Sequence, residues 1–143
     1  MNPGALAKLD LLAAAKEAAL LDRLSRHHEA LQRYEAQRGI LSDYQQRLAD
    51  LWRGGALVRA GDAKRAGQFS IQADEAAAQL IQSLEAERAK LAECAAALAE
   101  IRARRRNLQD RLLAAQRLET TKAQERAAQN RPAPRRAHHE SLT

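Results

Sequence analysis

Two pairs of adjacent histidines and a single cysteine are the side chains in this sequence best suited to metal or redox chemistry. The pairs are His27-His28 and His138-His139, and the cysteine is Cys94. Adjacent residues on a helix point about 100° apart, so a histidine pair on a helix makes a poor chelate. One cysteine can form neither an intrachain disulfide nor a paired-cysteine metal site. We therefore expect no metal and no cofactor.

The motifs that position catalytic groups are also missing from the sequence. It contains no G-x-x-x-x-G-K-[ST] phosphate loop, no Gly-rich strand-to-helix turn and no H-E-x-x-H. No pattern brings a serine, a histidine and an aspartate together. We predict that the chain is not an enzyme.

The basic run R-A-R-R-R at residues 102–106 is the strongest charge feature. Residues 1–101 carry 13 basic and 14 acidic side chains, whereas residues 102–143 carry 11 basic and 4 acidic ones. The excess of +6 therefore lies entirely in the last third, which favours an acidic partner. A basic zipper would place its long leucine repeat after the basic run, and few aromatic residues are present for base stacking. We favour a protein partner and expect no nucleic acid; a coiled-coil nucleic-acid-binding or chromosome-associated protein is the alternative.

A heptad repeat at residues 77–115 indicates the element that carries these charges. Apolar residues alternate at spacings of three and four without Gly or Pro, which predicts a narrow seam facing a partner helix. The low aromatic content of 3% suits a two-helix seam better than a thick core. The seam residues are Ala77, Leu80, Leu84, Glu87, Leu91, Cys94, Leu98, Ile101, Arg105, Leu108, Leu112 and Ala115.

The first half of the chain supplies a matching seam. Its residues are Leu20, Leu24, His27, Leu31, Tyr34, Arg38, Leu41, Gln45, Leu48 and Trp52, preceded less regularly by Leu6, Leu9, Ala13 and Glu17. The predicted fold class is all-α: a long antiparallel two-helix coiled-coil hairpin with a flexible basic C-terminal tail.

Glycine and proline set the predicted boundaries. Pro3 suits the first turn of a helix over about 3–53, and the sequence Gly54-Gly55 favours its end. We expect a connection over about 54–69, its far end helical if Asp62 acts as an N-cap. A second helix follows over about 70–130. The hairpin domain is thus 1–130, and 131–143 is expected to be a disordered basic tail.

The register of the hairpin follows from the two charged residues within the seams. Facing residues in an antiparallel coiled coil keep a constant sum of residue numbers. A sum of 125 sets Arg38 opposite Glu87, whereas a sum of 118 leaves both charges opposite leucines. Because an unpaired buried charge costs several kcal/mol, we predict a sum of 125 with Arg38 and Glu87 fixing the register.

Apolar side chains near the loop exceed what one narrow seam can bury. Phe69, Ile71, Leu80 and Ile81 cannot all face the same partner helix. They indicate either ragged packing at the tip of the hairpin or a docking patch for a second protein. We leave these two interpretations open.

The sequence predicts no membrane span and no signal peptide. No run of about 18 apolar residues occurs, and the first residues lack a basic segment followed by an apolar core. With its single cysteine, the chain is expected to be cytoplasmic.

Taken together, these features resemble the FliJ family of flagellar export proteins and its YscO-type relatives in virulence secretion. The likeness covers nearly the whole chain and lies in the order and spacing of short segments. Where the family often has Trp in the second helix, this chain has Ile101 and alanines. The matching segments are Gly4-Ala5-Leu6-Ala7, Ser42-Asp43-Tyr44-Gln45, the basic run leading into Asn107-Leu108-Gln109, and Gln116-Arg117.

The resemblance implies a non-enzymatic cytoplasmic stalk of a type III export apparatus, peripherally associated with the inner membrane. Its expected partners are the hexameric export ATPase, an FlhA-like export gate and the export chaperones. The expected ATPase-binding residues are Arg117, Lys122, Arg126 and Arg131. The expected gate-binding residues are Phe69, Ile71, Ala76, Gln79 and Ser83.

Overall fold

A computed structural model describes residues 2–54 and 60–132 of the chain. The described residues form two long α-helices, α1 (Pro3–Arg53, 51 residues) and α2 (Ala60–Gln129, 70 residues). The predicted all-α, two-helix fold is confirmed. Of the predicted C-terminal tail, only Arg131 and Pro132 are described, and residues 133–143 lie outside the described residues.

Local hydrogen bonds and proline set the ends of both helices. The Asn2 Oδ1 atom accepts a hydrogen bond of 2.8 Å from the backbone N–H of Ala5, so Asn2 acts as an N-cap before Pro3. At the other end of α1, the N–H of Gly54 donates to the carbonyl of Asp50 at 2.8 Å. After α2, Pro132 lacks the N–H that a further helical turn would need.

The start of α2 corrects the predicted connection. We expected a connection through residue 69, but α2 already begins at Ala60. Gly61 and Gly67 favoured a loop, since each costs a helix about 1 kcal/mol relative to alanine. Ala66 in the same stretch is only 7% exposed, and Ala73 two helical turns further on is only 4% exposed, so small residues continue the seam. Packing against α1 therefore outweighs the local preference of the glycines.

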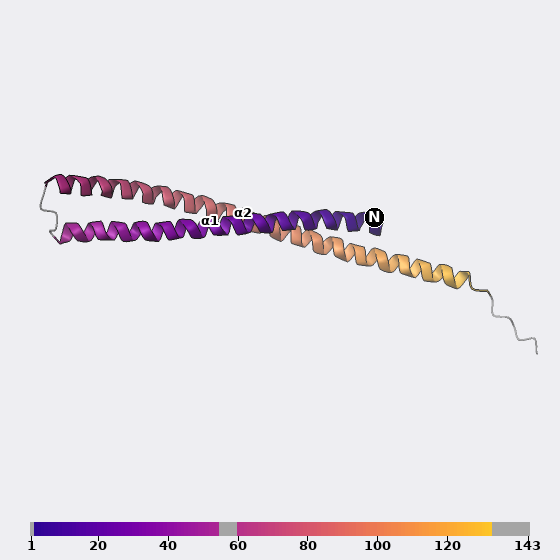
Figure 1. Cartoon of the computed structure of the whole chain (residues 1–143). Helices are drawn as coiled ribbons and strands as arrows, with labels where there is room; N and C mark the ends of the chain where they lie inside the picture. Colours follow the sequence, from indigo (N-terminus) through magenta and orange to yellow (C-terminus); the bar gives the residue numbers. More distant parts are fainter. Residues whose placement is uncertain (1, 55–59, 133–143) are drawn as a thin grey trace, which may run out of the picture. The chain divides into compact units, whose positions relative to one another are not determined.

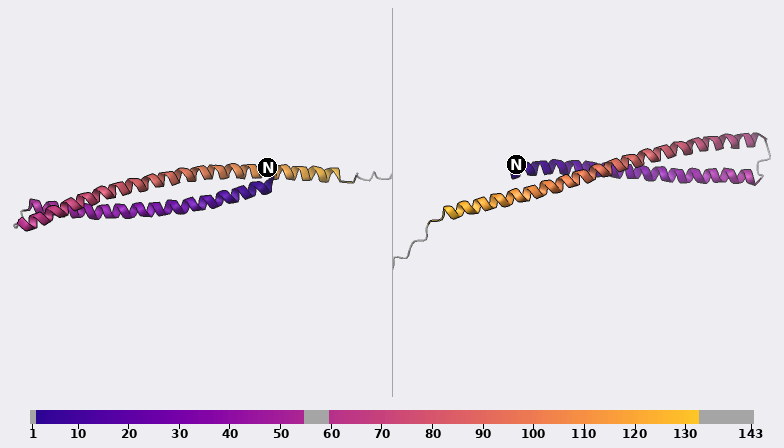
Figure 2. Two further views of the ribbon diagram at one scale, coloured as in Figure 1. Left: turned by 90° about the horizontal axis from the view of Figure 1, so that it is seen from above. Right: turned by 180° about the vertical axis from the view of Figure 1, so that it is seen from behind.

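By their packing, the residues form two units, one of residues 1–14 with 103–143 and one of residues 15–102. Within each unit, a segment of α1 lies beside a segment of α2 that runs in the opposite direction (Figures 1 and 2). Each unit is thus a two-helix antiparallel pair, and its core is a single seam.

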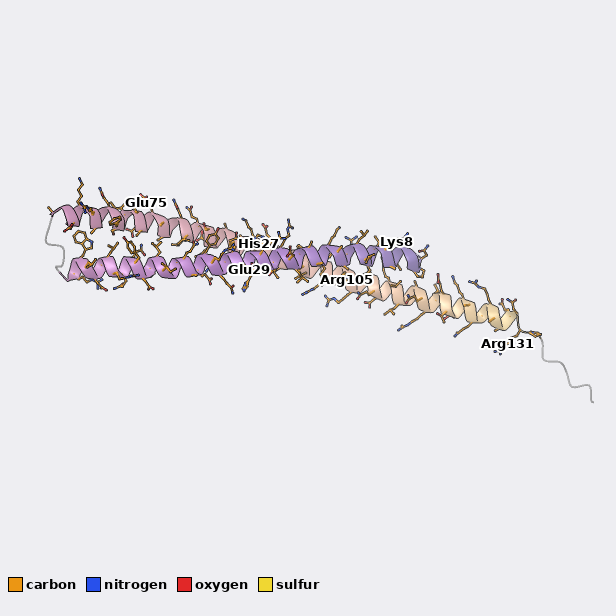
Figure 3. All side chains as sticks on the ribbon, in the orientation of Figure 1. Lys8, His27, Glu29, Glu75, Arg105 and Arg131 are labelled. Carbon is orange, nitrogen blue, oxygen red and sulfur yellow. The ribbon has the colours of Figure 1, made fainter. Side chains whose placement is uncertain are left out.

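Burial confirms most of the predicted seam. Every predicted seam residue of α2 is buried or half-buried, and so is every one of α1 except Arg38 and Trp52. Figure 3 shows side chains of both helices meeting in the space between the ribbons. The most buried apolar residues are Leu6, Ala13, Leu48, Ala66, Ala73, Leu84, Cys94, Leu98 and Leu108.

Hydrogen bonds between the helices show that the predicted register is wrong by one heptad. Gln45 Nε2 donates to Asp74 Oδ1 at 2.9 Å, and Arg102 Nε donates to Glu17 Oε1 at 3.0 Å. The residue numbers of each pair sum to 119, close to the alternative of 118. A sum of 125 would instead set Gln45 opposite Leu80.

The predicted pairing of Arg38 with Glu87 is also wrong. Glu87 Oε2 lies 2.9 Å from His27 Nδ1, and Glu87 Oε1 lies 3.7 Å from Lys90 Nζ. Arg38 is exposed and makes no ion pair with Glu87. The flexible stem of an arginine lets its charge reach water from the edge of a seam, so Arg38 needs no acidic partner. His27 and Lys90 contact the seam carboxylate instead.

The observed register predicts a specific crosslink. It places Tyr34 in the layer of Leu84, not of Leu91. With Cys94 replaced by serine, we expect cysteines at positions 34 and 84 to form an intramolecular disulfide under mild oxidation. The matched control has cysteines at 34 and 91, because residue 91 lies one heptad further along the seam of α2 than residue 84. Faster crosslinking of the 34 and 91 pair, measured by gel mobility, would contradict this register.

Candidate functional site

An apolar groove runs between α1 and α2 toward the loop end of the unit of residues 15–102. It has a volume of about 550 Å³. Of the residues that line it, Arg47 alone is charged. Side chains of both helices form its walls, and Figure 3 shows this part of the hairpin around the labelled Glu75. The lining residues are Gln37, Ile40, Leu41, Tyr44, Arg47, Ala76, Gln79, Leu80 and Ser83.

The groove contains three of the five residues predicted to bind an export gate. Ala76, Gln79 and Ser83 line it. Phe69 and Ile71 do not, although both are exposed, at 49% and 61%. The structure therefore brings together only part of the predicted set.

The prediction missed the wall that α1 contributes to the groove. Ile40 is 68% exposed and Tyr44 is 38% exposed, so both large side chains present apolar surface to a partner. They lie one helical turn apart and outside the heptad seam, and this spacing was the available signal. Their role could not be recognised without the register that sets them beside α2.

A second, polar hollow of about 420 Å³ is lined by His27, whose Nδ1 lies 2.9 Å from Glu87 Oε2. The side chains of these two residues are 26% and 12% exposed. Arg23, Lys90 and Cys94 also line this hollow. No group of three metal-ligating side chains occurs within the described ranges. The arrangement supports a role for the His27–Glu87 pair in holding the two helices in register.

The unit of residues 1–14 and 103–143 concentrates the basic charge. Its described residues carry nine basic and four acidic side chains, whereas residues 15–102 carry 13 of each. Every described residue from 116 to 132 is exposed, including the four predicted to bind an ATPase: Arg117, Lys122, Arg126 and Arg131.

Helix geometry divides these basic residues between two faces. At 100° per residue, Arg111, Lys122 and Arg126 point within about 60° of one another. Arg117 points about 120° away from Arg111. The sequence reasoning missed Arg111, which lines a hollow of about 410 Å³ with Leu6, Ala114 and Ala115. Arg111 and Lys122 are 11 residues apart, which is close to three full helical turns, and this spacing could have shown that they share a face.

An ion pair at the seam of this unit holds a carboxylate in its charged form. Arg105 Nε donates to Asp10 Oδ1 at 3.0 Å. The pKa of Asp10 falls below its ordinary value of 3.8, chiefly because of this hydrogen bond, with the charge of Arg105 and a hydrogen bond from Gln109 adding to the effect. Desolvation opposes the shift. A seam arginine is therefore matched by a seam aspartate.

This lowered pKa gives a pH dependence with a defined sign. The contribution of Asp10 to folding is present above pH 3.8, where the carboxylate is charged in both states, and is lost as the pH falls through the folded-state value. We expect Asp10→Asn to lower the melting temperature at pH 7, and the deficit to shrink below pH 3.8. Circular dichroism at 222 nm measures both.

Asp110→Asn is the matched control, because Asp110 is an exposed carboxylate of the same unit without an interhelical partner among the described residues. A deficit of Asp10→Asn that stays constant down to pH 2 would contradict the assignment.

Comparisons of the chain with protein-family models, with curated proteins and with solved structures find no match. In the part of the chain that is described, no helix is long and apolar enough to cross a membrane.

Proposed function

We propose that this chain is a non-enzymatic stalk of a type III protein export apparatus. The observation that carries the proposal lies in the unit of residues 1–14 and 103–143, where α2 extends past the start of the antiparallel α1. Leu6, near the start of α1, lines a hollow with Ala114 and Ala115, and α2 continues to Gln129. About three helical turns of α2 thus extend past the end of its partner and are free to enter another protein.

The charge of this extension supports docking into the export ATPase. Arg117, Lys122 and Arg126 are exposed on it, and two of them share a face. Cations on an unpartnered helix favour an acidic, concave partner and speed its association. The pore of a hexameric ATPase is a partner of this kind.

The apolar groove supports a second contact, with the FlhA-like export gate. A helix laid into such a groove buries apolar anchors at spacings of three and four residues. Arg47 at the edge of the groove favours an acidic residue on that helix. Two distinct docking surfaces on one hairpin would let the chain link the ATPase to the gate and assist the handling of export chaperones. A contact with the gate would hold the chain at the inner membrane, as a peripheral component.

The test is co-purification of the full chain with the export ATPase and with the cytosolic domain of the gate protein, together with the rate of ATP hydrolysis. We expect both proteins to co-purify and the hydrolysis rate to rise. Absence of both complexes would overturn the proposal.

A salt titration separates this function from the nucleic-acid alternative, which the positive charge of residues 103–132 favours. Binding to duplex DNA through several phosphate contacts would fall about 10³-fold or more between 50 and 200 mM salt. Docking that also buries apolar surface should fall far less. Salt-sensitive binding to DNA without binding to the ATPase would establish the alternative.

A further inference from the structure

The outer side of the first turns of α1 combines exposed leucines with a cation. Leu11 and Leu12 are 72% and 63% exposed, whereas Leu6 and Ala13 on the seam are 3% and 4% exposed. Lys8, one turn before Leu11 and Leu12, is also exposed and is labelled in Figure 3. This face is therefore apolar and cationic, and α2 does not cover it.

The acidic residue of this segment is paired at the seam and does not lie on this face. Asp10 is the only acidic residue of α1 within residues 2–14, and it is held by Arg105 of α2 at 3.0 Å. Positive charge therefore dominates the surroundings of Leu11 and Leu12. In the same unit, Leu113 and Leu118 of α2 are 51% and 57% exposed, which adds further apolar surface.

We propose that this face of α1, made by Lys8, Leu11 and Leu12, binds the surface of an anionic lipid bilayer. An interfacial helix buries its apolar side chains at the headgroup boundary while its lysines and arginines meet the lipid phosphates. The nine basic side chains against four acidic ones in the described part of this unit supply the charge complementarity. This contact lies beyond the proposed function, in which a protein alone joins the chain to the membrane.

The shape of the face favours a bilayer over an acidic protein helix. Leu11 and Leu12 are adjacent and point about 100° apart, so they form a broad convex surface. A partner helix would need a narrow seam that repeats every three and four residues. A fluid bilayer accepts such a convex face without a repeat of this kind.

The first experiment reads insertion at residue 12 directly. In the full chain with Cys94→Ser, Leu12→Cys is labelled with the environment-sensitive fluorophore NBD. Vesicles of phosphatidylglycerol and phosphatidylcholine in equal amounts should shift its emission to shorter wavelength, and vesicles of phosphatidylcholine alone should not. The same label on Leu51→Cys, a residue 44% exposed in the other unit, should stay unshifted.

The second experiment measures flotation with the same vesicles. We expect Leu11→Ser combined with Leu12→Ser to lower the fraction bound about tenfold, because apolar area and charge act together in interfacial binding. Leu21→Ser combined with Leu51→Ser, which replaces two exposed leucines of the other unit (41% and 44% exposed), should leave binding unchanged. Circular dichroism verifies that both double variants remain helical.

Two outcomes would overturn the proposal. Binding to anionic vesicles with unshifted emission at residue 12 would assign lipid binding to the basic C-terminal segment. A shift produced by an acidic helical peptide but not by vesicles would assign the face to a protein partner.

Discussion

We expect a chain that ends after Leu118 to keep its hairpin but no longer to stimulate the export ATPase of the proposed function. This result is expected because the seam ends at Ala115, and every described residue from 116 to 132 is exposed. Removing the residues from 119 onward takes away no buried contact among the described residues. The truncation does remove Lys122 and Arg126, the part of the basic face that extends past α1. We expect ATP hydrolysis to return to the rate of the ATPase alone.

Charge reversal on one face of the full chain refines this prediction. Lys122→Glu combined with Arg126→Glu should reduce the stimulation about as strongly as the truncation, because like charges would then oppose an acidic pore. Arg117→Glu is the matched control, since Arg117 points to a different face, and it should retain more of the stimulation. If the truncated chain remains helical and stimulates the ATPase as strongly as the full chain, the segment after Leu118 does not dock into the ATPase.

Leu84→Ala should be the most destabilising single truncation in the hairpin. Leu84 is 1% exposed and is the largest fully buried side chain described. Deleting a buried leucine loses its transfer free energy and leaves a cavity, which together cost about 2–5 kcal/mol. A seam only two helices thick has few other contacts to compensate for this loss. Urea unfolding followed by circular dichroism measures the change in the free energy of unfolding.

Two substitutions control this measurement. Ile81→Ala removes a similar volume from a residue that is 43% exposed, and it should cost less than about 1 kcal/mol. Leu84→Met preserves the volume and should cost less than about 1.5 kcal/mol. Equal losses for Leu84→Ala and Ile81→Ala would show that this layer of the seam is not packed as described.

The sequence alone was enough to predict the helices and the faces they bury. A heptad repeat is a local pattern, and its spacing specifies a seam whatever lies opposite. Every predicted seam residue of α2 is accordingly buried or half-buried. The concentration of positive charge in the last third could also be predicted from the sequence, because the net charge of a segment is the sum of its charged residues. The local preference of Gly61 and Gly67 misplaced the start of α2, since propensity carries no information about packing.

Only the tertiary structure decided the register and, with it, the candidate sites. Shifting two heptad seams by seven residues keeps apolar positions facing apolar positions, so periodicity cannot separate a sum of 118 from one of 125. Of the ten helical residues gained before residue 70, those from 65 to 69 face residues 49–53 of α1 at a sum of 118, whereas at a sum of 125 they would face positions beyond Arg53. His27 then meets Glu87 in place of Arg38. The same slip sets Tyr44 beside Ala76, and the groove exists because side chains distant in sequence are brought together by that register.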